Sequence, residues 1–184
     1  MRPLFVMHGE KMENERKPRE NRCYELLDSL GIEYLRADHD RADTIEQCHD
    51  VEKIIDAPIP KNLFLTNRQK TSFYLLIMPG DKPFKTKYLS AQIGSARLSF
   101  ASGEDMEKYL DTHPGSASVL GLMNDRDGAV KLLVDKPVLD MEYIGCHPCE
   151  NTSTLKIRTK DVIEKILPEI KHNMQIVDLP EDME

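Results

Sequence analysis

The segment Ser72–Met78 limits the possible folds of this chain more than any other, because it is a short and almost unbroken apolar run. A strand that is apolar on both sides needs cover on both faces of its sheet. A second strand candidate, Asn62–Thr66, comes just before it, and the polar residues 67–70 between the two indicate an antiparallel hairpin. We therefore expect a layered domain in which helices cover a sheet.

Several helices are expected around this hairpin. Apolar residues recur at three- and four-residue steps after Arg19, and Gly31 stands where a helix C-cap is expected. A capping-box signature begins at Ser102, and Pro58 and Pro60 end another helix because proline does not fit a helix interior. The expected helices span about 19–30, 44–55, 85–93, 103–110 and 160–167.

Strand candidates outnumber the helices. Besides the hairpin they are residues 32–36, 98–100, 119–123, 130–134, 138–141, 142–144 and 155–158. Because hairpin connections mix with helical ones, the predicted fold is a single mixed α/β domain with a largely antiparallel central sheet flanked by helices. We place a charged lead-in at residues 1–18, the domain at 19–171 and an acidic tail at 172–184.

Bulk properties fit one such domain of 184 residues with 40% hydrophobic and 31% charged residues. No apolar run is long enough for a membrane helix, and the N-terminal apolar patch is too short for a signal peptide, so a cytoplasmic location is expected. Four cysteines without secretory features predict no disulfide framework.

The net charge of −7 has the wrong sign for coating nucleic acid but allows a local contact. Basic residues gather in two groups, most of which are expected to be solvated: Lys11, Arg16, Lys17, Arg19 and Arg22, and then Lys82, Lys85, Lys87 and Arg97.

Small or polar residues lie beside apolar runs in three segments, as expected where strand ends line a ligand cleft. These segments are Lys61–Leu65, Gly115–Asp125 and Gly145–Thr154. In this order and at these separations they resemble the prolyl-tRNA editing domain family, also called YbaK-like. The resemblance runs from about Glu20 to Ile170.

The resemblance implies a curved mixed sheet around a pocket and a freestanding trans-editing deacylase. Such an enzyme hydrolyses the ester of mischarged tRNA(Pro), above all Ala-tRNA(Pro), in a pocket that admits alanine and excludes proline. Its partners are the tRNA acceptor end and, transiently, prolyl-tRNA synthetase, and no cofactor or metal is implied. The implied catalytic residues are Lys61 and His147, and the implied substrate-binding residues are Asn62, Phe64, Gly115, Ser116, Ser118, Gly121, Asn124, Pro148, Asn151, Thr152 and Thr154.

Lys61 stands at the start of a buried strand, so its ammonium either reaches solvent or holds an anion inside the cleft. In the resembled family, the lysine at this position is the central active-site residue. A compact ammonium can bind a phosphate or polarise an ester carbonyl as negative charge develops on its oxygen. Asn62 beside it would donate an amide hydrogen bond to the substrate.

The loop Gly115–Ser118 follows a helix, and small residues let backbone N–H groups approach a ligand closely. Such loops are also common as ordinary turns. The matching loop of the family lines the aminoacyl pocket. Val119 and Leu120 depart from the proline and bulky apolar residue frequent there, which bears on amino-acid specificity. Gly121, Asn124 and Asp125 match the family better.

His147-Pro148, Asn151-Thr152 and Thr154 match the family residue for residue. With an ordinary pKa near 6.5, His147 is either a general base or a residue that orients the substrate or a water. Asn151 and Thr152 would fix the loop or contact the terminal adenosine.

Cys146-x-x-Cys149 overlaps this segment and is also compatible with half of a zinc site or a redox pair. No second closely spaced cysteine pair accompanies it, and it lies between strand candidates rather than at a helix start, which disfavours both. No Ser-His-Asp arrangement, P-loop or dinucleotide fingerprint is found. The alternatives to a deacylase are a non-catalytic protein that senses tRNA or a free amino acid through the same pocket, and a zinc-dependent protein.

Overall fold

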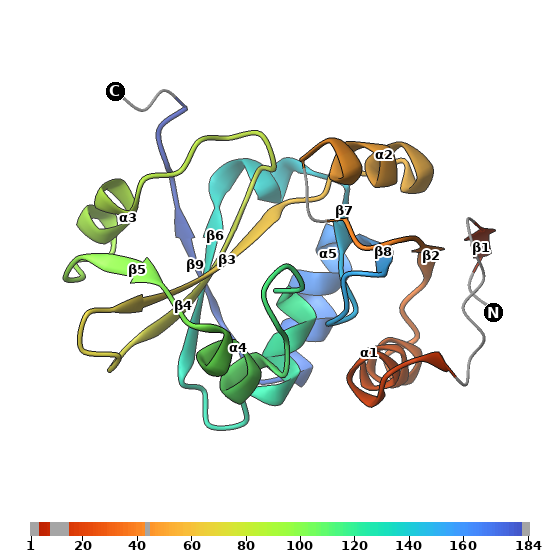
Figure 1. Cartoon of the computed structure of the whole chain (residues 1–184), viewed down its shortest axis with the longest axis horizontal. Coiled ribbons are helices and arrows are strands. Elements are labelled where there is room, and N and C mark those ends of the chain that lie inside the picture. The colour runs from red at the N-terminus through yellow and green to blue at the C-terminus, as the bar shows by residue number, and fades with distance from the viewer. Residues whose placement is uncertain (1–3, 8–14, 43–44, 182–184) are drawn as a thin grey trace.

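Two β-sheets that share one hydrophobic core form the frame of the protein (Figure 1). The computed structural model describes residues 4–7, 15–42 and 45–181. Five strands in the order β5-β3-β4-β6-β9 make the larger sheet, and four in the order β1-β2-β8-β7 make the smaller one. The strands are β1 Leu4–Met7, β2 Tyr34–Asp38, β3 Lys61–Asn67, β4 Phe73–Met78, β5 Leu98–Phe100, β6 Val130–Asp135, β7 Tyr143–Cys146, β8 Ser153–Arg158 and β9 Met174–Val177.

The predicted hairpin is the centre of the larger sheet. β3 and β4 pair antiparallel from Lys61 opposite Met78 to Thr66 opposite Phe73. Every residue of β4 is buried, as its apolar sequence requires. β4 then pairs parallel with β6, and β6 pairs parallel with β9. The mixed α/β class is therefore confirmed, with the strands divided between two sheets.

Nine helical segments surround these sheets in the described part of the chain. The α-helices are α1 Pro18–Ser29, α2 Ile45–Ile55, α3 Thr86–Gln92, α4 Gly103–Leu110, α5 Thr159–Asp161 and α6 Leu167–Glu169; 3₁₀ turns span Val119–Asn124 and Lys136–Asp140, and a π-helical stretch spans Val162–Ile166. No described helix has the length and apolar character needed to cross a membrane.

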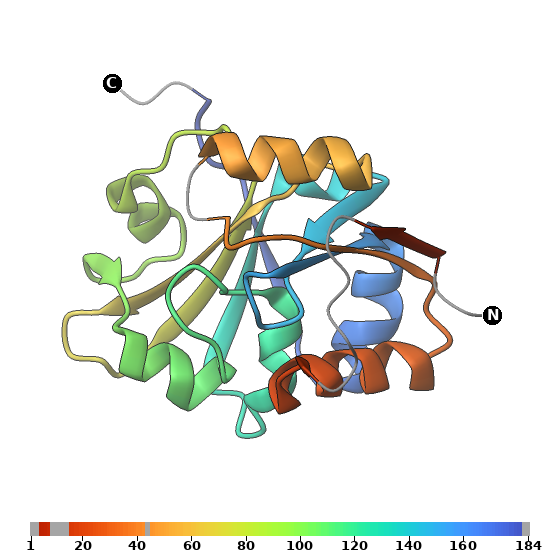
Figure 2. The same cartoon turned by 45° about the vertical axis from the view of Figure 1, so that its right-hand side comes forward.

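Three apolar clusters hold these layers together. The largest lies between the sheets and joins Leu27 of α1, Phe64 of β3 and Leu155 of β8. A second packs α3 against the outer face of the larger sheet, and a third packs α2 against the smaller sheet at Ala37. α1 and α2 consequently lie on opposite sides of the smaller sheet (Figure 2).

The strand expected at 119–123 is wrong, because Val119–Asn124 is a 3₁₀ helix. Ser118 caps it by accepting a hydrogen bond from the backbone nitrogen of Leu120 at 3.2 Å. A Cβ on Gly121 would come within 3.0 Å of the backbone oxygen of Leu110, so this turn packs directly on the end of α4. A short apolar run fits a buried strand and a buried helical turn equally well, and here the packing decides.

Two further segments differ from expectation. The strand candidate 138–141 lies largely in the 3₁₀ turn Lys136–Asp140, which has proline in its first turn. The expected acidic tail 172–184 contains β9, whose Val177 is 3% exposed. β1 lies in the expected lead-in and pairs parallel with β2.

Candidate active site

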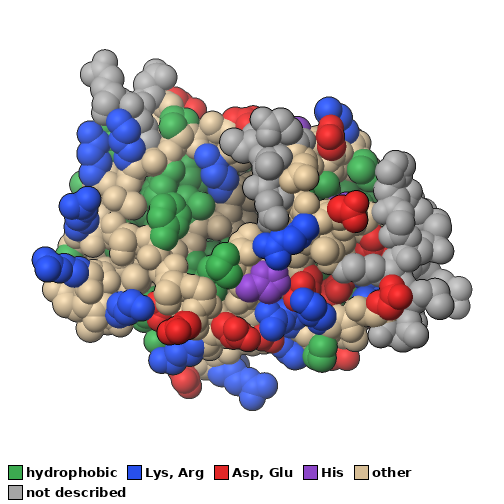
Figure 3. Space-filling model, in the orientation of Figure 1, with side chains coloured by type: hydrophobic (Ala, Val, Ile, Leu, Met, Phe, Trp, Pro, Cys, Tyr) green, Lys and Arg blue, Asp and Glu red, His purple; other side chains and the backbone are tan. Residues whose placement is uncertain are grey.

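A cavity of about 400 Å³ opens where the two sheets meet. Its walls come from residues 59–64 at the start of β3, from Pro114, Gly115 and Ala117 of the loop after α4, and from residues 145–147 at the end of β7. Met106 of α4, with Phe100 and Ala101 at the end of β5, completes the lining. The face of the molecule that carries α3, β5 and α4 shows a hydrophobic patch among Lys and Arg side chains (Figure 3).

Lys61 places its ammonium at the edge of this cavity. The Nζ atom donates a hydrogen bond to the backbone oxygen of Lys82 at 2.5 Å. Burial lowers the pKa of Lys61, and the negative charge of Asp81 partly opposes that effect. No carboxylate among the described residues lies within ion-pair distance of this ammonium. It is therefore suited to bind an incoming anion or to polarise a carbonyl oxygen.

Asn62 follows Lys61 in β3 and points to the other face of the larger sheet, because successive strand residues alternate between faces. Its side chain lines the cavity. Its Nδ2 donates to the backbone oxygen of Pro60 at 3.1 Å, which fixes the orientation of the amide. Its Oδ1 is buried and has no hydrogen-bond partner among the described residues. A buried acceptor of this kind is costly unless a ligand supplies a donor.

His147 enters the cavity from the end of β7 as a neutral imidazole. Its Nδ1 lies 3.0 Å from the backbone oxygen of Ser153, which can only accept, so Nδ1 carries the proton and Nε2 has the lone pair. Burial lowers the pKa of His147 to about 4, with smaller contributions from His39 and His113. The hydroxyl of Thr154 connects the His147 and His39 rings, at 3.3 Å and 2.8 Å respectively.

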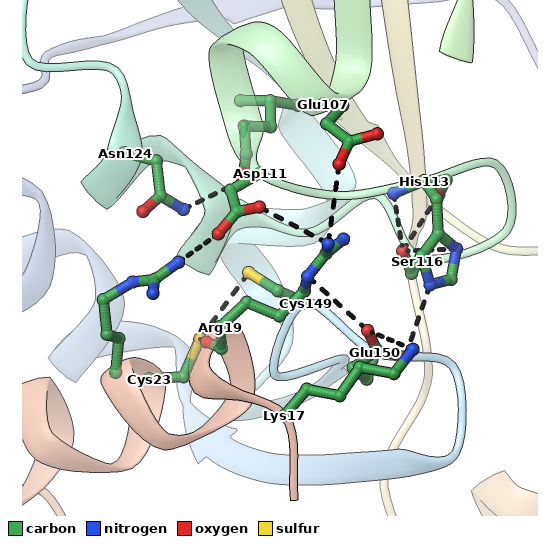
Figure 4. Close-up of polar contacts among 12 residues, drawn as sticks. Lys17, Arg19, Cys23, Glu107, Asp111, His113, Ser116, Asn124, Cys149 and Glu150 are labelled. Carbon is green, nitrogen blue, oxygen red and sulfur yellow. Dashed lines mark hydrogen bonds and ion pairs between the residues drawn. The ribbon is translucent and has the colours of Figure 1, made fainter. Parts of the chain in front are cut away.

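A network of ion pairs holds the 113–117 loop that forms another wall (Figure 4). His113 Nε2 lies 3.3 Å from the buried carboxylate of Glu150, which also pairs with Lys17 at 3.0 Å and with Arg19 at 3.6 Å. Burial opposes ionisation of Glu150, but Lys17 and His113 still hold its pKa below the ordinary value. The Ser116 hydroxyl donates to the backbone oxygen of His113 at 2.9 Å and so closes the loop on itself.

Residues 39–165 match the family model of the aminoacyl-tRNA editing domain. The chain belongs to this family. It is 32% identical over 153 residues to the prolyl-tRNA editing protein ProX of Acetoanaerobium sticklandii, an alignment that covers 83% of this chain and 93% of that protein. It is 26% identical over 155 residues to prolyl-tRNA synthetase associated domain-containing protein 1 of Danio rerio, covering 83% of each.

Solved structures show the same fold. A crystal structure of a candidate trans-editing enzyme for prolyl tRNA synthetase superposes with a TM-score of 0.68 at 14% identity, covering 91% of this chain and 100% of the other. The hypothetical protein APE2540 superposes with a TM-score of 0.63 at 13% identity, covering 82% of this chain and 95% of the other. Family membership and fold together confirm the resemblance predicted from the sequence.

The residues predicted from sequence divide into two groups in this editing domain. Lys61, Asn62, Phe64, Gly115 and His147 line the cavity. The others, although buried or partly buried nearby, hold the surrounding loops: Ser116, Ser118, Gly121, Asn124, Pro148, Asn151, Thr152 and Thr154.

The contacts of this second group are internal to the protein. Asn124 donates to the backbone oxygen of Leu110 at 2.9 Å, and Asn151 donates to the backbone oxygen of Ala42 at 3.0 Å. The backbone oxygen of Thr152 accepts from the nitrogen of His39 at 3.1 Å. These hydrogen bonds hold the loops around the cavity.

Several cavity residues lay outside the sequence prediction. Gly145 is the clearest, because a Cβ there would come within 2.6 Å of Ile59 Cγ1 and 2.8 Å of Ile55 Cδ1. Its nitrogen donates to the backbone oxygen of Pro58 at 2.7 Å, which joins the smaller sheet to the strand that carries Lys61. Two features of the sequence could have indicated this contact. Gly145 begins the segment that contains His147, and the run Pro58-Ile59-Pro60 comes just before Lys61.

The cysteines of the Cys146-x-x-Cys149 motif are both buried. Cys149 has its sulfur 3.6 Å from that of Cys23 in α1, and burial raises the pKa of Cys146 to about 12. Within residues 4–7, 15–42 and 45–181, no three His, Cys, Asp or Glu side chains are grouped so that they could hold a metal ion.

Proposed function

We propose that this editing domain is an aminoacyl-tRNA deacylase that hydrolyses the ester of mischarged tRNA(Pro), with Ala-tRNA(Pro) as its main substrate. The supporting observation is the cavity that brings together the Lys61 ammonium, the unpaired Asn62 oxygen and the neutral His147 ring. The names of its relatives, a prolyl-tRNA editing protein and prolyl-tRNA synthetase associated proteins, support prolyl-tRNA as the tRNA involved.

The reaction needs little chemical assistance, since an aminoacyl ester is already activated. Water adds to the ester carbonyl carbon, the bond from that carbon to the ribose oxygen breaks, and the ribose leaves as an alcohol. Lys61 stabilises the negative charge that develops on the carbonyl oxygen or holds the adjoining phosphate. Asn62 Oδ1 accepts a hydrogen bond from the amino group of the aminoacyl ester, which gives the buried oxygen its missing partner.

His147 orients the water in this proposal. Its unprotonated Nε2 accepts a hydrogen bond from a water O–H, because Nδ1 is committed to Ser153. With a pKa of about 4, the ring is a weak base at neutral pH. Positioning of the water therefore carries more of the rate than proton removal.

Size accounts for the preference for alanine. Phe64, Met106 and Ala117 line the cavity, and Phe64 and Met106 are buried and packed in the core between the sheets. A methyl side chain would fit such walls with less displacement than the ring of proline, as in the second sieve of an editing system.

The decisive measurement is deacylation of Ala-tRNA(Pro), Pro-tRNA(Pro) and Ala-tRNA(Ala) by wild type and by Lys61→Ala. We expect selective loss of alanine from tRNA(Pro) and at least a hundredfold slower hydrolysis by the variant, the order seen when a charge-stabilising donor is removed. Lys156→Ala is the matched control, since Lys156 has its Nζ near Asp56 outside the cavity.

Two results would contradict the proposal. Intact Ala-tRNA(Pro) after incubation with a large excess of enzyme would rule out deacylation. Saturable tRNA binding without turnover would instead identify the protein as a sensor. A transient contact with prolyl-tRNA synthetase belongs to the same proposal, and co-sedimentation of the two proteins with and without tRNA tests it.

A further inference from the structure

A second and larger hollow of about 950 Å³ adjoins the editing cavity. It lies between α3, β5 and the start of β3, and three residues line both hollows: Lys61, Leu63 and Phe100. We call this second hollow the outer groove. The outer groove is therefore continuous with the edge of the cavity at which the Lys61 ammonium lies.

The two hollows meet because part of β3 has an open edge. β5 pairs only with Leu65 to Asn67, so within the described residues Lys61 to Leu63 have no neighbouring strand on that side. Leu63 packs with the cluster on the α3 face of the sheet, whereas Phe64 packs with the core between the sheets. The two hollows thus lie on the two faces of the larger sheet and meet at this edge.

An exposed aromatic side chain lies in the outer groove. Phe100 is 64% exposed. Among the described residues, only one other large hydrophobic side chain is exposed to a similar degree, that of Ile176 at 53%. The Phe100 ring contacts that of Phe84 edge-on, with centroids 6.4 Å apart. Exposing a phenylalanine to water is unfavourable, so a flat partner that covers it would stabilise the complex.

All charged residues in the lining of the outer groove are basic. Lys61, Lys85, Lys87 and Arg97 line the outer groove, and none of its described lining residues is acidic. This local excess contrasts with the net charge of −7 for the whole chain. The same side of the molecule shows Lys and Arg side chains around a hydrophobic patch (Figure 3). Proteins bind single-stranded nucleic acids with aromatic rings set among cations, because bases stack on the rings and phosphates pair with the cations.

From this we infer that the outer groove binds the unpaired nucleotides that precede the terminal adenosine at the 3′ end of the tRNA. The inference rests on the proposed function, because it places the aminoacyl ester in the cavity and the strand leading to it across Lys61. Phe100 would stack on one base. Arg97 and the lysines would contact phosphates.

Binding of a labelled single strand tests the stacking directly. The probe is the ribotetranucleotide ACCA carrying a fluorophore at its 5′ end, titrated with full-length protein and followed by fluorescence anisotropy. Phe100→Ala should weaken binding roughly tenfold, the order expected for one base stacked on an aromatic ring. Ile176→Ala is the matched control, because Ile176 is 53% exposed on β9 at the opposite edge of the same sheet. Equal affinities of Phe100→Ala and Ile176→Ala would overturn the inference.

Salt dependence tests the phosphate contacts. Arg97→Gln should reduce the slope of log affinity against log salt by about 0.7, the value for one phosphate contact on a single strand. Arg126→Gln, a change of an exposed arginine in the turn before β6, should leave the slope unchanged. An unchanged slope in Arg97→Gln would remove Arg97 from the binding surface.

A short substrate separates this inference from the proposed function. Alanyl-adenosine carries the ester but lacks the preceding nucleotides. Arg97 lines the outer groove but not the cavity, so Arg97→Gln should hydrolyse alanyl-adenosine at the wild-type rate while showing a raised KM for Ala-tRNA(Pro). If wild type hydrolyses both substrates and Arg97→Gln matches it on both, the outer groove inference fails and the deacylase stands. If wild type hydrolyses neither, but Phe100→Ala loses ACCA binding, the outer groove stands and the deacylase fails.

Discussion

At the scale of the residue, the surroundings of His147 decide which chemistry it can perform. Sequence leaves a histidine free to act as a base or as an orienting group, because its ordinary pKa lies close to neutrality. Burial beside two other histidines lowers that pKa to about 4, and the Ser153 carbonyl fixes the tautomer. Neither effect is visible in the motif itself, since both depend on how β7 and β8 meet.

The lowered pKa predicts a loss of stability in acid. The unfolded chain takes up a proton on His147 near pH 6.5, whereas the folded protein does so only near pH 4. Stability from this group is therefore complete above about pH 6.5 and is lost as the pH falls towards 4. Over this pH range the free energy of unfolding of His147→Gln should fall by on the order of 2 kcal/mol less than that of wild type.

Urea unfolding of both proteins between pH 7.5 and pH 4.5 measures that difference. Asp38 and Glu150 also have lowered pKa values and lose stability in acid, but they are present in both proteins and cancel in the comparison. Parallel curves for wild type and His147→Gln would contradict the prediction.

Gly145 makes a second prediction at this scale. Gly145→Ala should destabilise the protein by about 1–3 kcal/mol, because its Cβ would overlap Ile59 and Ile55. Gly103→Ala is the control, since a Cβ there meets Pro114 only at 3.4 Å, an ordinary contact. Thermal unfolding of the two variants gives the comparison, and similar melting temperatures would show that the isoleucines move aside freely.

At the scale of the element, a buried ion pair joins the start of α1 to the smaller sheet. Arg16 Nη2 lies 2.7 Å from Asp38 Oδ2, and the side chains are 1% and 10% exposed. Ser153 of β8 donates to the other Asp38 oxygen at 2.6 Å, and Glu20 of α1 also contacts Arg16. Burial raises the pKa of Asp38, but Arg16 and Ser153 together hold it below the ordinary value.

Removing the cation of this cluster should cost more than removing all three charges. Arg16→Met should lower the free energy of unfolding by about 3–5 kcal/mol because it leaves the buried carboxylates of Glu20 and Asp38 without the cation that pairs with both, while the triple variant Arg16→Met, Glu20→Leu, Asp38→Leu should lose less. Asp50→Ala, which breaks the exposed pair with Lys53, should have no measurable effect. Equilibrium urea unfolding distinguishes these cases. A triple variant less stable than Arg16→Met would contradict the prediction.

The elements that the sequence predicted well are those whose signals are local. The β3–β4 hairpin lies within one residue of its expected bounds, because its turn and apolar pattern are contained in a short stretch. The 119–123 run was misassigned since its conformation depends on contact between Gly121 and Leu110 of another helix. β9 was missed because its partner, β6, lies far away in the sequence.

The candidate site divides in the same way. Lys61, Asn62 and His147 were found through motifs and do line the cavity, while their chemical roles stay predictions. Met106 also lines the cavity, but it reads in the sequence as an ordinary core residue of α4. Only the assembled fold shows that this helix faces the site.

At the scale of the whole molecule, the C-terminal strand completes the larger sheet. Val177 of β9 is buried in the cluster beneath α3, and the nitrogen of Leu179 donates to Asp135 Oδ1 at 2.9 Å. The chain thus returns to the sheet that contains Lys61 after building most of the smaller one. Folding of the two sheets is expected to be cooperative for this reason.

Val177→Ala should therefore destabilise the whole protein by about 1–2 kcal/mol through loss of buried methyl groups. Ile176→Ala, one residue earlier but 53% exposed, should change stability little. Far-UV circular dichroism and deacylation activity followed through the same urea transition should change together for both variants. Activity lost well before the circular dichroism signal would show that the sheets unfold separately.

The alternation of side chains along β3 has a consequence for how specificity can diverge. Asn62 and Phe64 lie on the cavity side of the strand, and Leu63 lies on the α3 side. On our proposals, Asn62 and Phe64 lie beside the amino acid, Leu63 lies on the side of the nucleic acid, and Lys61 lies where the two meet. Evolution, or a designer, can then exchange the amino acid that is removed without altering the grip on the carrier, by substituting every second residue of one short strand.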